Sequence, residues 1–433
     1  MERDDRLMIR SDWLREEVHG RRLENGLWVF VLPKPRFLKK HALLAARYGS
    51  IDVSFRAPGE AAAASVPEGI AHFLEHKLFE REDGNAFDRF SQNGAYCNAY
   101  TSYTVTAYHF SCTDLFDENL RLLIDFLELP PFTEEAIARE KEIIGQEIKM
   151  YEDSPDWRGL LNLLDALYVV HPVKVDIIGT GESIARIDKA ALDRCYRAFY
   201  QPPNMALFAT GDLDPEAVFA TAARAFEARP LPAAAGDPVR VAPAEPPGVA
   251  RPRAEARLDV AHPRALLGFK DRDVGFDGPA LLRKDIEMTF ILDLAFGRSS
   301  SFFQRHYESG LLDQSFQATY AGERDHGHAV LGGETEDPER LHQAILEELR
   351  TVKASGFAAS DFERIKRKAM GRFLRSFNSL EFVANGFVAS HFLRFGFFDY
   401  LPALDAVRLE DLHARLETQL DEARSAVSIL RPA

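Results

Sequence analysis

Two histidines and one glutamate lie within a single short stretch of the chain, residues 69–76 (GIAHFLEH). On a helix, His72 and His76 occupy positions i and i+4, so both imidazoles project from one face and can share one tetrahedral metal ion. Glu75 lies beside His76, where its carboxylate can take a proton from a water that the metal activates. The three side chains therefore have the types and spacing of a zinc-dependent hydrolytic site.

The H-x-x-E-H order is an inverted form of the zinc-peptidase motif. The same residues also fit a simpler interpretation, in which two histidines lie on a buried helix and one is hydrogen-bonded to a neighbouring carboxylate. A catalytic zinc needs three protein ligands and one open position. If His72 and His76 bind zinc, the third ligand must come from another segment.

The segment 133–150 is predicted to be a helix, and it offers three acidic candidates, Glu140, Glu142 and Glu147. Glu140 and Glu147 are seven residues apart and share one stripe of the helix, and the isoleucines between them favour an interior-facing surface. We favour Glu147 as the third ligand and Glu140 as an acid that orients a histidine or the base. The alternative is a solvated acidic face that pairs with the lysines of the same helix.

A composition shift divides the chain into halves of similar size. Residues 229–253 hold seven prolines and almost no large apolar side chains, which is typical of an extended, semi-rigid linker. The predicted domains are therefore 1–228, with the candidate metal site, and 254–433.

The two halves share a weak repeat. Residues 132–141 and 357–366 match at Phe, Arg and Lys, and each segment follows a strand-like run and an amphipathic helix. Strand patterns such as 42–48 and 205–210 occur without a regular strand–helix–strand rhythm. This organisation predicts an α+β fold of two homologous domains, each a mostly antiparallel sheet with helices packed on one face.

The composition excludes several classes of partner. A net charge of −14 argues against binding to a nucleic-acid backbone. Three widely spaced cysteines without a C-x-x-C pair fit a reducing compartment. The charged N-terminus and the absence of a long apolar run predict a soluble, cytoplasmic protein without a membrane span. We expect His171 to be structural and the pair His326 and His328 to lie in a solvated turn.

The stretch 69–76 is one of several motifs by which the sequence resembles the M16 family of zinc metallopeptidases, the inverzincins. The other motifs are Gly49-Ser50, Gly94-Ala95 followed by Asn98-Ala99 and Thr101-Ser102, Glu140 with Glu147, His171-Pro172, Gly179-Thr180, and Asn204-Met205 followed by Gly211-Asp212. The resemblance covers most of the chain, and it implies the two-domain M16/LuxS-like metallohydrolase architecture.

The resemblance also implies roles for the residues in these motifs. It implies one zinc ion per chain, held by His72, His76 and Glu147, with Glu75 as the general base. It makes Glu140 a supporting acid. The implied activity is that of an endopeptidase that cleaves extended peptides or unfolded segments.

A further implication of the resemblance concerns substrate binding. Asn98 and Ala99 would lie on an edge strand to which the substrate peptide adds in extended form. From the residues alone, Asn98 would be taken for a turn residue.

One departure from the family pattern bears on partners. Active members carry an Arg and, seven residues later, a Tyr in the second half, whereas His306 and Asp313 occupy those positions here and Arg305 is out of register. The second half also lacks a copy of the metal motif. The resemblance therefore implies a heterodimer with a metal-free M16-like chain that supplies Arg and Tyr. The alternative functions are a non-catalytic subunit and a maturation factor that acts in a protein complex.

Overall fold

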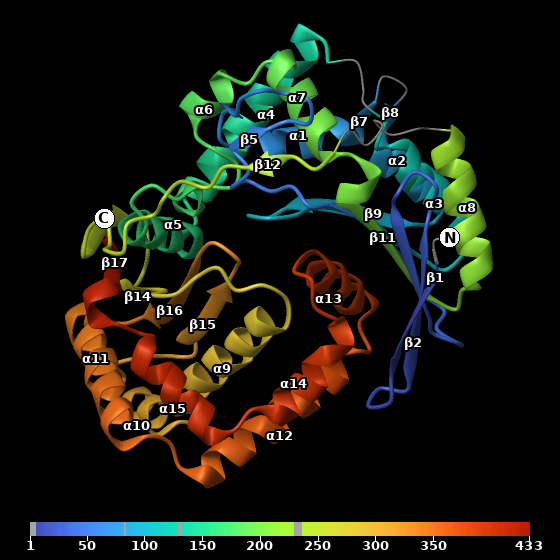
Figure 1. Cartoon of the computed structure of the whole chain (residues 1–433). Coiled ribbons are helices and arrows are strands. Elements are labelled where there is room, and N and C mark those ends of the chain that lie inside the picture. The colour runs from blue at the N-terminus through green and yellow to red at the C-terminus, as the bar shows by residue number, and fades with distance from the viewer. Residues whose placement is uncertain (1–5, 82–83, 129–131, 229–235) are drawn as a thin grey trace. The chain divides into compact units, whose positions relative to one another are not determined.

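The computed structural model describes residues 6–81, 84–128, 132–228 and 236–433 (Figure 1). The chain folds into two compact units, and each unit is assembled from three segments. Unit 1 contains Met1–Ile148, Asp176–Val241 and Ser376–Phe392, and unit 2 contains Lys149–Val175, Ala242–Arg375 and Leu393–Ala433.

The described part of unit 1 is built on a seven-stranded sheet in which β3 and β11 are parallel and all other neighbours are antiparallel. From one edge to the other, its strands are β1 (Arg6–Ser11), β2 (Glu16–Arg22), β3 (Trp28–Pro33), β11 (Met205–Gly211), β4 (Lys40–Ala46), β10 (Thr106–Cys112) and β9 (Tyr96–Thr101). A small separate sheet contains β12 (Val239–Arg240), β5 (Ser54–Arg56) and β6 (Ala64–Ser65). β9 therefore lies at an edge of the main sheet.

Alternate side chains of these strands point to opposite faces of the sheet. Leu207 and Ala209 of β11 belong to the main apolar core, whereas Phe208 between them points the other way. Helices cover the core face, and they include α1 (Ile70–Phe79), α2 (Ala86–Gln92), α3 (Phe116–Asp125), α4 (Glu134–Glu152), α7 (Lys189–Phe199) and α8 (Pro215–Ala228). The predicted helices at 70–78 and 133–150 correspond to α1 and α4.

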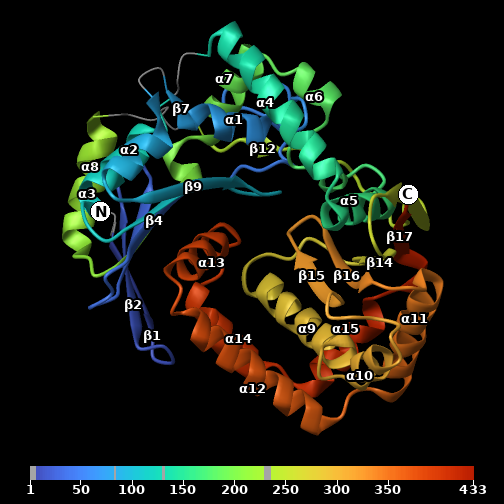
Figure 2. The same cartoon turned by 180° about the vertical axis from the view of Figure 1, so that it is seen from behind.

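The opposite face of this sheet is covered by a helix from the C-terminal part of the chain, α13 (Leu380–Phe392) (Figures 1 and 2). The ring of Phe387 packs at 4.8 Å centroid distance from both Phe30 of β3 and Phe208 of β11. Glu381 pairs with Lys39 and accepts a hydrogen bond from Ser111. Thus α13 adds a second helical layer to the one that the sequence predicted for this domain.

We expect Phe387→Ala to destabilise unit 1 by about 3–5 kcal/mol, because it removes a buried ring between two others. Phe382 on the same helix is 38% exposed, so Phe382→Ala serves as a matched control with an expected cost below about 1 kcal/mol. Urea denaturation followed by tryptophan fluorescence measures both costs. Equal costs for the two substitutions would show that α13 does not stabilise the sheet.

Unit 2 repeats the arrangement of unit 1 with fewer strands. Its five-stranded sheet has the order β13 (Arg253–Leu258), β17 (Ser425–Pro432), β14 (Arg264–Lys270), β16 (Gly327–Glu334) and β15 (Gln317–Gly322). β13 and β17 are parallel and the other pairs are antiparallel. The order and directions match those of β3, β11, β4, β10 and β9. The shared topology agrees with the predicted duplication.

Helices also lie on both faces of the unit 2 sheet. One face packs against α9 (Gly278–Phe296), α10 (Ser301–Glu308), α11 (Pro338–Ser355), α12 (Ala359–Ser376), α14 (Tyr400–Ala406) and α15 (Leu409–Thr418). The other face packs against α5 (Pro155–Leu167), which comes from the N-terminal half. A Cβ at Gly268 would lie 2.6 Å from a side-chain methyl of Leu167 on α5, so a larger residue here would have to displace that leucine.

Two helices belong to the unit built mainly from the other half of the chain: α5 belongs to unit 2 and α13 to unit 1. The physical reason is that the apolar faces of these helices pack on the sheet encoded by the other half of the chain. Sequence order alone did not reveal this exchange.

The described part of the predicted linker 229–253 makes specific contacts with unit 2. Residues 229–235 lie outside the described part, and 242–253 belong to unit 2. Glu245 accepts hydrogen bonds from the backbone N–H groups of residues 169–171 and forms an ion pair with Lys270 at 2.5 Å. The described part of the segment is therefore anchored to unit 2 by the partly buried carboxylate of Glu245.

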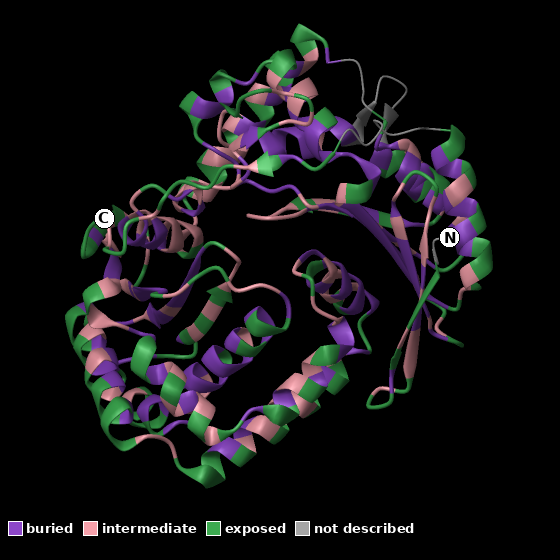
Figure 3. Cartoon of the chain, viewed as in Figure 1, coloured by how far each residue is buried: buried purple, intermediate pink, exposed green. Residues whose placement is uncertain are grey.

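Buried residues are concentrated in the central strands of both sheets and in the helix faces that cover them (Figure 3). In the part of the chain that the structure describes, every helix is too short or too polar to cross a membrane.

Candidate metal-binding site

Helix α1 begins directly after Gly69, whose φ is +84°. A Cβ at Gly69 would lie 2.5 Å from the carbonyl oxygen of Ile178, and a Cβ at Gly179 would lie 2.7 Å from that of Glu68. Both positions therefore need glycine, because the two backbone segments touch. This contact fixes the N-terminal end of α1 against the segment that precedes α6 (Gly181–Ala185).

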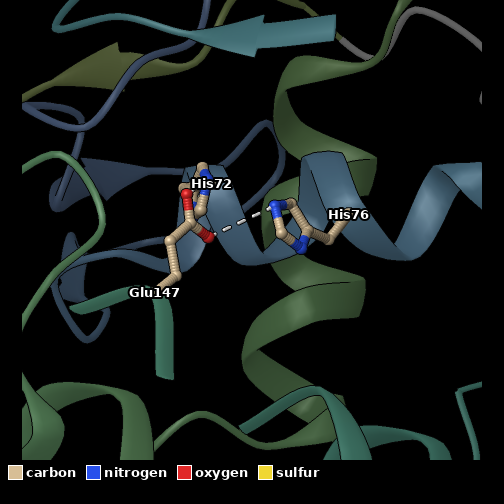
Figure 4. Close-up of side chains that lie close together, drawn as sticks. All are labelled: His72, His76 and Glu147. Atoms are coloured by element: carbon tan, nitrogen blue, oxygen red, sulfur yellow. Dashed lines mark ion pairs between the residues drawn. The ribbon is translucent and has the colours of Figure 1, made fainter. Parts of the chain in front are cut away.

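The structure brings His72, His76 and Glu147 together (Figure 4). Nε2 of His72 lies 3.8 Å from Oε1 of Glu147, and Nε2 of His76 lies 3.8 Å from Oε2 of the same carboxylate. The two imidazoles project from consecutive turns of α1, with ring centroids 4.4 Å apart. The carboxylate comes from α4, so two helices far apart in sequence form this cluster.

The donor atoms fit a zinc ion. Zinc prefers nitrogen and carboxylate ligands at about 2.0–2.1 Å, so tetrahedral ligand atoms lie about 3.3 Å from one another. The potential ligand atoms of His72, His76 and Glu147 all lie within 4.8 Å of one another. Shifts of less than about 1 Å per side chain close the difference, and three protein ligands leave one position open for substrate or water.

Glu140 holds His76 in a suitable orientation. Its Oε1 lies 2.9 Å from Nδ1 of His76, which leaves Nε2 of that ring directed at Glu147. Glu140 is buried and also lies near Lys77, whose ammonium is 3.8 Å from its other oxygen. A carboxylate at the second ring nitrogen fixes the tautomer and orientation of a ligating histidine. Of the other predicted candidates, Glu142 is exposed on α4 and takes no part in the cluster.

Glu75 lies on α1 and is buried. Its Oε2 accepts a hydrogen bond of 2.6 Å from the hydroxyl of Thr101, on strand β9. Burial raises the pKa of Glu75 to about 7, although the Thr101 hydrogen bond and the nearby His76 act in the opposite direction. A carboxylate with a pKa near neutrality is suited to accept and return a proton.

Burial also acts on the pKa values of the three candidate ligands, and it raises that of Glu147. The two histidines respond differently. Burial lowers the pKa of His72 to about 3, with a smaller contribution from His76. Burial acts to lower the pKa of His76 as well, but the hydrogen bond to Glu140 and the charges of nearby glutamates outweigh it, and the net shift is upward. The neutral imidazole of His72 keeps a lone pair available for a metal at neutral pH.

Strand β9 carries Asn98 and Ala99 at the edge of the unit 1 sheet. Asn98 is exposed and is not in a turn, while Ala99 points toward the helical face and packs against the core. One side of β9 pairs with β10, and in the described residues the other side has no strand partner. Asn98 and Ala99 therefore lie on an edge strand of the unit 1 sheet.

Gly49 and Ser50 support the turn between β9 and β10. A Cβ at Gly49 would lie 2.3 Å from the backbone of Tyr103, and the N–H of Ser50 donates to the carbonyl of Ser102. This contact explains why the sequence motif has glycine at position 49.

Two contacts of β9 were not predicted from the sequence. Thr101 bonds to Glu75, and Tyr100 donates a hydrogen bond of 2.5 Å to the side chain of Asn385 on α13. Because Ala99 and Thr101 are two residues apart on a strand, they share the helical face, so the direction of the Thr101 side chain could have been predicted from the sequence. The contact between Tyr100 and Asn385 could not have been predicted in this way, because α13 lies far along the chain.

A second group of possible ligands lies in unit 2 and contains His171, Asp325 and His326. Nδ1 of His171 accepts a hydrogen bond from the backbone N–H of Val173, so the ring proton of neutral His171 is on Nε2, which faces Asp325 at 3.5 Å. Nδ1 of His326 lies 2.8 Å from the same carboxylate. A proton on Nε2 blocks metal ligation, so this group forms a polar network around Asp325.

His171 therefore has the structural role that we expected, as the N-cap of a short 3-10 helix. The expectation for His326 and His328 was wrong. Both are buried rather than solvated, and Nδ1 of His328 lies 3.1 Å from the hydroxyl of Tyr168. The flanking glycine suggested a turn, but α5 and its following segment cover this end of β16.

Family models match most of the chain. The model described as "Insulinase (Peptidase family M16)" matches residues 58–181, and the model described as "Peptidase M16 inactive domain" matches residues 186–369. The chain is 39% identical over 427 residues to "Uncharacterized zinc protease YmfH" of Bacillus subtilis, covering 98% of this chain and 99% of that protein. "Putative zinc protease AlbF" of the same organism is 33% identical over 46% of each chain.

Solved structures of M16 peptidases are also similar to this chain. A putative M16-like peptidase from Alicyclobacillus acidocaldarius has a TM-score of 0.93 and 37% identity, covering 97% of this chain and 99% of that chain. Pitrilysin shares the fold, with a TM-score of 0.76 and 17% identity over 99% of this chain and 47% of its own length. The cluster on α1 and α4, the two family models and the end-to-end relatives agree, and the chain belongs to peptidase family M16.

Proposed function

We propose that this chain is a zinc-dependent endopeptidase subunit that cleaves extended peptides or unfolded segments of proteins. The observation that supports it most is the meeting of His72, His76 and Glu147 next to a buried carboxylate, Glu75. A relative over the whole chain is named a zinc protease, which agrees with this chemistry. In the proposal His72, His76 and Glu147 hold one zinc ion, and Glu140 orients His76.

When bound, zinc supplies a Lewis acid that lowers the pKa of water and polarises a carbonyl. Glu75 accepts the proton of the water that attacks the scissile carbonyl and returns it to the leaving amine. The open edge of β9, with Asn98 and Ala99, binds the substrate backbone as an added strand. Main-chain hydrogen bonds of this kind favour an extended substrate over a folded one.

A partner chain is part of the proposal. His306 packs on Phe302 with ring centroids 4.6 Å apart, and Arg305 forms an ion pair with Glu348. Asp313 accepts hydrogen bonds from Ser315. His306 and Asp313 stand where active family members have Arg and Tyr, and both side chains, like Arg305, are engaged in these local contacts. We therefore propose that a metal-free M16-like chain supplies the Arg and the Tyr in a heterodimer.

We expect a second M16-like chain to co-purify with this chain from its native organism, and mass spectrometry identifies it. That chain should carry Arg and Tyr seven residues apart and lack H-x-x-E-H. Adding it should raise zinc-dependent cleavage of an unfolded protein by at least about tenfold, which is the scale of one electrostatic group in a transition state. Full cleavage by the isolated chain, unchanged by the partner, would contradict the heterodimer.

A non-catalytic or maturation-factor role within a protein complex is the alternative. It predicts that a Glu75 variant supports the complex as well as the natural chain does. The complete donor set and the buried base favour the peptidase.

A further inference from the structure

Thr101 makes the single hydrogen bond that the structure gives to the Glu75 carboxylate among the described residues. Its Oγ1 lies 2.6 Å from Oε2 of Glu75, and Glu75 is 7% exposed. A short hydrogen bond to a buried carboxylate restricts the rotation of that side chain. The bond joins helix α1, which carries the proposed base, to strand β9, which carries the proposed substrate edge.

The position of Thr101 is itself well determined. It is the last residue of β9 and pairs across the strands with Thr106, whose hydroxyl donates to the carbonyl of Tyr48 at 2.8 Å. The turn that follows is closed by hydrogen bonds between Ser102 and Val105. Thr101 is therefore held at the end of a tight hairpin.

The side chains of β9 alternate between the two faces of the sheet. Asn98 and Tyr100 point to the face that α13 covers, while Ala99 and Thr101 point to α1. Among the described residues no second strand pairs with β9, and the backbone N–H of Ala99 donates to Oδ1 of Asn98 at 2.9 Å. A peptide that pairs with β9 will order the same backbone that carries Thr101.

We propose that Thr101 is a positioning residue, whose hydroxyl holds the Glu75 carboxylate in the orientation for proton transfer. Through Thr101, binding of a peptide to β9 also restrains the base, so substrate binding and base orientation are coupled. This inference rests on the proposed function of Glu75 and assigns Thr101 a role that the sequence analysis did not give it.

Thr101→Val tests the proposal, because valine keeps the shape of threonine and removes the hydroxyl. With a peptide substrate and the zinc-loaded complex, we expect kcat to fall about 10- to 100-fold, the scale expected for a misplaced catalytic group. KM should change by less than about threefold, because the backbone edge that binds the peptide is unchanged. Zinc content should remain the same as in the natural chain.

Two further variants separate positioning from general stability. Thr101→Ser keeps the hydroxyl and should restore kcat to within about threefold of the natural value. Thr210→Val makes the same chemical change on β11, where the buried hydroxyl has no hydrogen-bond partner among the residues that the structure describes, and should leave kcat unchanged. Equal losses in the Val and Ser variants of Thr101 would mean that packing, and not the hydroxyl, matters.

Crystal structures of the metal-free variants give a result that does not depend on activity. We expect the Glu75 carboxylate to change rotamer or occupy several positions in Thr101→Val and to keep its position in Thr101→Ser. An unmoved Glu75 in Thr101→Val overturns the inference. Cleavage that persists in Glu75→Gln would instead overturn the proposed function, so the two failures are distinguishable.

Discussion

Glu75→Gln is expected to lower kcat for peptide cleavage by about 10²–10⁴-fold, the range for loss of a general base. The amide has nearly the same shape and can still accept the hydrogen bond from Thr101, but it cannot take a proton from water. The buried position of Glu75 and its raised pKa, about 7, are the structural basis for the expectation. The measurement is cleavage of a fluorogenic unfolded protein by the zinc-loaded complex.

The variant should retain zinc, because Glu75 is not one of the three clustered ligands. Glu142→Gln on the exposed face of α4 is a suitable control and should cleave normally. Cleavage by Glu75→Gln at the natural rate would remove Glu75 from the role of base. Loss of zinc together with activity would show that Glu75 is needed for the metal rather than for proton transfer.

Loss of a proposed ligand is expected to have the second large effect. In His76→Ala or Glu147→Ala, the zinc content measured by plasma mass spectrometry should fall from about one ion per chain to near zero, because two protein ligands remain out of the three that a catalytic zinc site uses. Peptide cleavage should fall with it. Chelation of the natural chain should give the same loss, reversed by added zinc.

A graded series distinguishes ligands from supporting residues. Glu140→Gln should weaken zinc binding by about 10- to 100-fold, the usual effect of removing an orienting carboxylate. Glu142→Gln should not change zinc binding, although it lies on the same helix. If His76→Ala and Glu147→Ala still bound one zinc with natural affinity, the metal would have to lie elsewhere, and the site on α1 and α4 would be rejected.

Part of the site could be predicted because it is local. The i, i+4 spacing of His72 and His76 projects two imidazoles from one helical face wherever the helix lies. Glu147 could be preferred over Glu142 because a helical stripe distinguishes an inward from an outward face. The mostly antiparallel α+β fold followed from element order, and the matching strand orders of the two sheets agree with the repeat around residues 132–141 and 357–366.

Other features depended on contacts between distant segments. The sequence indicated a linker at 229–253, but not that Glu245 would be anchored by three backbone N–H groups and a lysine. It indicated a turn at His326 and His328, which the structure buries. In both cases local composition was polar or irregular, and packing from another segment decided the outcome.

By itself, the sequence determined which residues could bind a metal and which carboxylate could act as a base, because these follow from side-chain chemistry and helical spacing. Only the tertiary structure decided that Thr101 would hold Glu75 and that α5 and α13 would pack on the sheets of the opposite halves. Such contacts depend on the burial of apolar faces, and this driving force does not specify which segments of the chain pack together. Their outcome is a property of the whole fold.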